Sequence, residues 1–190
     1  MDRRQKKTKK AIYDAFTELI QEKDYSEITI QDIIDRADIG RSTFYSHFRT
    51  KDELLEDMCD RIFHHIFTDH ATSEDTHDFS DSTNTLSDML THLLYHLRSH
   101  REIVTGMLLR SSSPIFLRYL DEYLTGLFRP FIPSDLEAPF DYLLDAAIHS
   151  FSRTVTWWAE RGMKDSPESV EKMFSFANPW LKFETGSDNA

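Results

Sequence analysis

Side chains that can bind nucleic acid are concentrated between residues 29 and 51 of this sequence. Hydroxyl, imidazole and ammonium groups donate to phosphate oxygens, and an arginine matches the two acceptors that guanine presents in the major groove. The side chains expected to read bases are Arg41, Ser42, Thr43 and Ser46. The side chains expected to bind phosphates are Thr29, Tyr45, His47 and Lys51, with Gln31 as a further DNA-binding candidate. The pattern indicates a surface that reads duplex DNA.

Three helices are expected to position these side chains. Apolar residues recur at helical spacing between positions 12 and 20, which predicts a first helix over 6–22. Thr29 followed by Asp32 is typical of a capping box and predicts the start of a second helix. Residues 38–40 contain turn formers that end this helix, and a third is predicted over 41–48. Two short helices joined by a tight turn form a helix-turn-helix.

Two aromatic residues of the third helix have a structural role instead. Phe44 and Phe48 are expected to pack inward against the apolar face of the first helix and against Ile33. This packing would hold the third helix at a fixed angle to the other two.

Residues 28–55 resemble the DNA-binding signature of the TetR family of regulators. The matching residues are Thr29, Ala37, Thr43, Phe44, Tyr45, His47, Phe48, Lys51, Glu53 and Leu54. In that family the outward donors are typically phosphate contacts. Two positions depart from the pattern, because Asp38 stands where glycine is common and Gly40 where serine is common. Both residues are tolerated in turns and caps, so the departures affect the local backbone more than the fold.

The charge is divided unevenly along the chain. The net charge of -11 taken alone argues against a nucleic-acid binder. Residues 1–50 carry 10 basic and 9 acidic side chains, whereas residues 51–190 carry 12 and 24. Six basic residues precede position 11: Arg3, Arg4, Lys6, Lys7, Lys9 and Lys10. We expect this segment to seek phosphates, although a solvated helix start would have the same composition.

The rest of the chain is also predicted to be helical. A connecting helix follows residue 50, and further helices are expected around 86–97, 102–109, 113–128, 140–161 and 166–180. Polar and acidic residues 68–85 are expected to form an exposed loop. The fold class is therefore all-α, with about nine helices. The expected division is a DNA-binding head over 1–52, a helical dimerisation and effector-binding domain over 53–185, and a loose tail over 186–190.

The family resemblance implies that the rear domain dimerises and binds a small molecule. The helix over 140–161 carries two adjacent apolar stripes, so one of the two is expected to face a partner, and the alternative is a thick monomeric core. The predicted interface is Leu144, Ile148, Phe151, Val155, Trp158 and Phe174. The effector is expected to contact Met89, Leu93, Tyr95, Met107, Phe116, Tyr119, Tyr123 and Phe151, all of which are also explained as core residues.

Histidine and cysteine patterns do not add a second site. His92, His96 and His100 have metal-ligand spacing, but no cysteine or carboxylate motif completes a site, so no metal is predicted. Cys59 is the only cysteine, which excludes an intramolecular disulfide, and it is expected to pack in a helix. No cofactor is expected other than an unknown small-molecule effector.

Other functional classes find less support in the sequence. The chain has no Glu-x-x-His pair and no nucleophile–base motif, so it is not expected to be an enzyme. It has neither a secretory signal nor an apolar run of about 20 residues, so a cytoplasmic protein is expected. We predict a ligand-responsive repressor that binds a palindromic operator as a homodimer. Activation is not excluded, and the alternative is a family member that acts through a partner protein without binding an operator.

Overall fold

The computed structural model describes residues 3–63, 85–110 and 113–183. Within these ranges every regular element is helical, which confirms the all-α prediction. The α-helices are α1 (Arg3–Glu22), α2 (Ile30–Ala37), α3 (Arg41–Tyr45), α4 (Lys51–Phe63), α6 (Leu86–Ser99), α7 (Arg101–Leu108), α8 (Ser113–Phe128), α9 (Phe140–Glu160) and α10 (Pro167–Ala177). Two 3-10 helices, η1 (Tyr25–Glu27) and η2 (Arg129–Phe131), complete them. The predicted loop over 68–85 lies outside the described residues except for Thr85, and the predicted tail lies wholly outside them.

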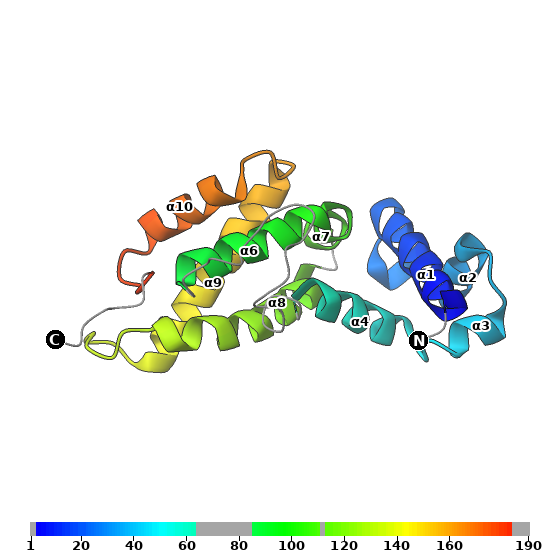
Figure 1. The fold of residues 1–190 in the computed structure, drawn as a ribbon, viewed down its shortest axis with the longest axis horizontal. Coiled ribbons are helices and arrows are strands. Elements are labelled where there is room, and N and C mark those ends of the chain that lie inside the picture. The colour runs from blue at the N-terminus through cyan, green and yellow to red at the C-terminus, as the bar shows by residue number, and fades with distance from the viewer. Residues whose placement is uncertain (1–2, 64–84, 111–112, 184–190) are drawn as a thin grey trace.

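Helices α1, α2 and α3 form a small head at one end of the molecule (Figure 1). Its core contains Phe16, Ile33 and Phe44, each fully buried. On the outside of the head, the Arg36 guanidinium donates to Glu22 at 2.7 Å and to Glu18 at 3.0 Å, which ties α2 to α1. Helix α4 leads from the head into the body formed by α6 to α10 (Figure 1).

Local signals in the sequence set several helix ends. The Thr29 hydroxyl accepts the Asp32 N–H, and the Asp32 carboxylate accepts the Thr29 N–H, so the predicted capping box is confirmed. Ser166 caps α10, and Pro167 occupies its first turn, as predicted. Gly162 follows α9 with a φ of 71°, a left-handed conformation that glycine adopts without steric cost.

The body has an aromatic core shared by three helices. Helix α8 packs on α9, α10 packs on α6, and α7 contacts both α8 and α9. The rings of Phe128, Phe151 and Phe174 meet with centroid distances of 5.1 to 6.1 Å. Burial of these rings, together with the buried leucines of α6 and α8, stabilises this part of the fold.

Head and body meet where α1 packs against α7. Gly106 allows this approach, because a Cβ atom at that position would lie 2.6 Å from Cγ2 of Ile20. Close by, the Arg110 guanidinium donates to the Gln21 carbonyl. The head is therefore joined to the body both covalently through α4 and by packing through α7.

The six residues predicted to form the dimer interface are core residues of the single subunit. Leu144, Ile148, Phe151, Val155, Trp158 and Phe174 are all buried within one chain. Within one chain they already pack in the core of the body, and their interface role stays a prediction. The large apolar side chains that α9 and α10 expose are different ones: Phe140 is 43%, Tyr142 67%, Met173 41% and Phe176 88% exposed.

None of the helices within the described ranges is long and apolar enough to cross a membrane.

Candidate nucleic-acid interface

The turn between α2 and α3 is built from the two residues that depart from the family pattern. Asp38 ends α2 with a φ of 51°, in the left-handed region where glycine is usual. Gly40 then begins α3 in an extended conformation, with no side chain to cap the helix. Its carbonyl accepts the N–H groups of Thr43 and Phe44 at 2.9 and 3.1 Å. The turn therefore forms with the substituted residues in place.

Buried aromatic rings hold α3 in position. Phe44 is fully buried, and its ring lies 6.2 Å from that of Phe48. Phe48 also contacts the ring of Tyr13 from α1 at 6.1 Å. Both phenylalanines therefore pack inward, as the sequence predicted. The α-helix itself is shorter than predicted, because it ends at Tyr45 instead of Phe48.

The predicted base-reading side chains lie on the outer face of the head. Arg41, Ser42 and Ser46 are exposed, and Thr43 is partly exposed. The Arg41 guanidinium lies 5.7 Å from the centre of the Tyr45 ring and donates to Oε1 of Gln31 at 3.5 Å. The structure thus brings Gln31, Arg41 and Tyr45 together in one row of donors across α2 and α3, which we call the α3 donor row.

Thr29 is committed to capping α2. Its hydroxyl donates to Oδ2 of Asp32 at 2.6 Å while accepting the Asp32 N–H. The hydrogen bonds from Thr29, together with the ammonium of Lys23 at 2.9 Å, hold the pKa of Asp32 well below its usual range. This arrangement keeps Asp32 ionised and the start of α2 fixed.

Lys51 points into the head instead of into solvent. Its ammonium donates to the carbonyls of Tyr25 at 2.7 Å and Ile28 at 2.9 Å, and more weakly to that of Ser26 at 3.4 Å. It also lies 4.4 Å from the centre of the Tyr25 ring. Lys51 therefore binds the backbone that leads into α2, a role that sequence reasoning missed. The carbonyl groups belong to residues distant in sequence, so no local pattern signals the contact.

The basic segment forms the first turns of α1. Arg3, Arg4, Lys6 and Lys7 are exposed there. Lys9 instead donates to Oδ1 of Asp57 on α4 at 2.7 Å.

A polar network around Asp57 joins α1 to α4. The Tyr13 hydroxyl donates to the same carboxylate that binds Lys9. Partial burial opposes the charge of Lys9, but its hydrogen bonds with Asp57 and Tyr13 prevail and raise its pKa. One basic residue of the segment thus positions the head while its neighbours remain exposed.

The predicted effector residues do not form an open site. Leu93, Met107, Phe116 and Phe151 are fully buried, while Met89, Tyr95, Tyr119 and Tyr123 are partly buried. Three of the rings near the end of α4 are in contact, since Phe63 lies 5.8 Å from Phe116 and 5.3 Å from Tyr123. These side chains contribute to the core of the body, and their effector role stays a prediction.

The histidines form a pair and not a metal cluster in the part of the chain that the structure describes. Nε2 of His92 lies 2.8 Å from Nε2 of His96, whereas no group of three or more potential ligands comes together within the described ranges. Cys59 is buried, and burial together with Asp60 and Glu56 raises the pKa of its thiol to about 12. A thiol with this pKa is not a nucleophile near neutral pH.

A row of exposed donors on a short helix, fixed by buried rings behind a tight turn, defines a helix-turn-helix protein of the DNA-binding class. A family model described as bacterial regulatory proteins, tetR family, matches residues 12–58. A model of a transcriptional regulator C-terminal region matches residues 84–177. A crystal structure of a TetR transcriptional regulator from Streptococcus agalactiae is 34% identical, covers 93% of this chain and 96% of its own, and has a TM-score of 0.69. The chain belongs to the TetR family and is a DNA-binding transcription regulator, not an enzyme.

Two curated relatives match over shorter stretches. The uncharacterised HTH-type transcriptional regulator YxbF of Bacillus subtilis is 44% identical over 73 residues, which are 38% of this chain and 19% of that protein. The HTH-type dhaKLM operon transcriptional activator DhaS of Lactococcus lactis is 36% identical over 64 residues, which are 34% of either chain. The matched stretch is well under two thirds of both relatives.

Proposed function

We propose that this regulator is a ligand-responsive repressor that binds a roughly palindromic operator as a homodimer in the cytoplasm. The observation that carries the proposal is the α3 donor row, in which the Arg41 guanidinium stands between Gln31 and the Tyr45 ring. A helix-turn-helix inserts such a row into the major groove, and a dimer spaces two of them about 34 Å apart along the duplex.

Base reading and phosphate binding are divided between different parts of the head. Arg41 offers two parallel donors to guanine, and Ser42, Thr43 and Ser46 lie beside it. Tyr45 is the last residue of α3 and His47 follows the helix, and both can meet phosphate oxygens there. The exposed cations at the start of α1 add attraction that does not depend on base sequence. Lys51 contributes chiefly by fixing the backbone before α2.

We propose that a second copy of the chain packs against the outer face of α9 and α10. We call this face the α9–α10 face and define it by Tyr142, Trp157, Met173 and Phe176. Three of these side chains are exposed and Trp157 is partly exposed. Trp157 and Met173 line one shallow pocket together with Arg153 and Thr154, so α9 and α10 both contribute exposed apolar groups there. Exposed large apolar side chains with a polar surround are typical of interaction surfaces. With 21 residues, α9 extends for about 32 Å and offers enough length for a helix pair to form against a partner.

An effector would act by selecting one spacing of the two heads. In a dimer the spacing depends on how each head is held against its body, which here involves α4 and the contact of α1 with α7. A ligand that binds more tightly to a spacing unsuited to the operator releases the DNA.

Activation is the second mode that one observation favours. DhaS, which matches 64 residues of this chain, is described as a transcriptional activator. The same dimer on DNA would then recruit polymerase instead of excluding it. Placement of the selected operator relative to a promoter distinguishes the two modes.

The test is the selection of bound fragments from random duplex DNA at two salt concentrations. We expect a palindrome to be enriched and its affinity to fall steeply with salt. Arg118→Ala is a matched control for Arg41→Ala, because both arginines are exposed and lie over a tyrosine ring. Absence of enrichment at low salt would reject operator binding and favour a regulator that acts through a partner protein.

A further inference from the structure

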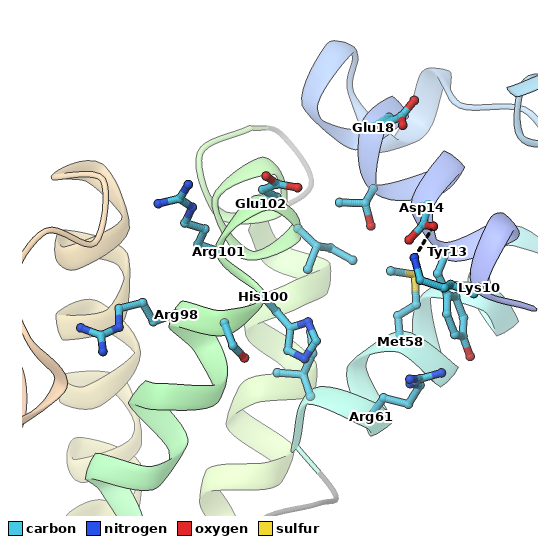
Figure 2. Close-up of a pocket in the computed structure, with 14 residues that line it drawn as sticks. Lys10, Tyr13, Asp14, Glu18, Met58, Arg61, Arg98, His100, Arg101 and Glu102 are labelled. Carbon is cyan, nitrogen blue, oxygen red and sulfur yellow. Dashed lines mark hydrogen bonds and ion pairs between the residues drawn. The ribbon is translucent and has the colours of Figure 1, made fainter. Parts of the chain in front are cut away.

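A groove of about 680 Å³ lies between the head and the body. Figure 2 shows its walls, which come from α1 and α4 on the side of the head and from α6 and α7 on the side of the body. The volume falls within the range of about 300 to 1,000 Å³ that small-molecule sites occupy. None of the predicted effector residues lines this groove.

The inner part of the groove is apolar and fixed. Tyr13, Met58, Ile62 and Ile103 contribute to it, and all four are buried. They come from three helices whose packing is set by the core, so they form a surface for a hydrocarbon or aromatic group before any ligand arrives.

The charges around the groove are unequally paired. Lys10 pairs with Asp14 at 2.6 Å, and Glu18 pairs with Arg36 outside the groove at 3.0 Å. Within the described part of the chain, no ion pair within 4.0 Å is recorded for the other charged lining residues, Arg61, Arg98, Arg101 and Glu102. These four side chains together carry a net positive charge, although residues 51–190, to which they belong, are strongly acidic as a whole.

Arg61 is the arginine best placed to meet a ligand. Its guanidinium stacks on the Tyr13 ring at 4.7 Å, at the edge of the apolar surface. His100 projects from the body toward α4, whereas Arg98 and Arg101 extend away from the head (Figure 2). Arg98 lies over the Tyr95 ring at 4.9 Å. The exposed Lys10–Asp14 pair is solvent-screened, so Lys10 can turn to a ligand at little cost.

We propose that this groove binds an amphipathic organic anion, a carboxylate or sulfonate on a hydrocarbon or aromatic body. The anionic group lies against Arg61, and the apolar body covers Met58, Ile62 and Ile103. Such a ligand contacts the head and the body at once, and so it favours one spacing between them. This last step rests on the proposed function, whereas binding itself does not.

The experiment is a fluorescence titration of the intact chain, without DNA, with the aromatic sulfonate 8-anilinonaphthalene-1-sulfonate. We expect the sulfonate to bind saturably. Octanoate should displace it at a lower concentration than octanol does, because octanoate carries a negative charge and octanol does not. Arg61→Gln should raise the octanoate concentration needed for half displacement about tenfold, because one charged hydrogen bond is lost. Arg118→Gln removes an equally exposed, ring-stacked arginine outside the groove and should change nothing.

A second variant tests the location without changing charge. Thr17 lines the groove and is partly exposed, so Thr17→Trp should fill the site and abolish displaceable binding while the chain still folds. Equal octanoate displacement from the wild type, Arg61→Gln and Thr17→Trp overturns the proposal. Because the titration contains no DNA, this result does not contradict operator binding. Failure to select an operator would likewise not contradict ligand binding in the groove.

Discussion

The α3 donor row and the α9–α10 face are both exposed, but they are built in opposite ways. The donor row consists of polar groups held over buried rings, with Phe44 fully buried beneath it. The α9–α10 face consists of apolar groups, with Phe176 88% exposed, over a core that is already complete without them. A polar row is well solvated until DNA arrives, whereas exposed large apolar side chains gain free energy when a partner covers them. Under the proposed function, the donor row therefore meets a reversible partner, DNA, and the α9–α10 face a permanent one, a second copy of the chain.

The largest effect is expected from Phe176→Glu on the α9–α10 face. A charge at the centre of an apolar dimer interface should convert the dimer to a monomer and lower operator affinity about a hundredfold or more. Sedimentation equilibrium should then give 22.4 kDa in place of about twice that mass. Phe176→Leu is the control and should remain dimeric. A wild type that stays monomeric at micromolar concentration would reject the α9–α10 face as the interface.

The donor row is tested next by Arg41→Ala. We expect the affinity for the preferred operator to fall by about 1–3 kcal/mol and base preference to relax at one position in each half-site. Lys6→Ala should instead weaken binding on all sequences and reduce the salt slope by about one unit. Fluorescence anisotropy on the operator and on scrambled duplexes separates the two effects. An equal loss for both variants on every duplex would contradict the division between base reading and phosphate binding.

Lys51→Met tests whether Lys51 stabilises the head or binds DNA phosphates. Because its ammonium binds backbone carbonyls, we expect the variant to lower the free energy of unfolding by about 2 kcal/mol. Urea denaturation measures this, and Lys7→Met, which removes an exposed cation, is the control. If the variant has unchanged stability but binds DNA more weakly, Lys51 is a phosphate-binding residue and not a stabilising one.

The smallest expected effect comes from Gly40→Ser. A serine can accept an N–H at the start of α3, and an added Cβ would lie 3.6 Å from Oγ1 of Thr43, an ordinary contact. We expect a gain of a few tenths of a kcal/mol in thermal stability. Calorimetry measures the change, and a loss of stability would mean that the extended conformation at position 40 does not suit a side chain.

Local features of the fold could be predicted from the sequence because their signals lie within a few residues. Thr29 with Asp32, Ser166 with Pro167, and the break at Asp38 gave correct helix ends. The start of α1 extends further back than predicted, to Arg3, because apolar spacing cannot detect a solvated first turn.

Features that depend on distant contacts could not be predicted in this way. Phe174 and Phe176 stand two positions apart on α10, yet Phe174 is buried and Phe176 is the most exposed large apolar side chain among the described residues. Two apolar stripes on α9 have the same periodicity, and the positions of α7, α8 and α10 decide which side chains face the core. The contacts of Lys51 with residues 25–28 have the same origin.

The absence of a side chain at Gly106 links two positions that stand far apart in the sequence. Since an added Cβ would lie 2.6 Å from Cγ2 of Ile20, a larger residue at 106 is compatible with this packing only if residue 20 becomes smaller. The two positions should therefore change together when such regulators diverge. A domain exchange that joins this head to the body of a relative should retain its regulation only when both residues come from compatible parents.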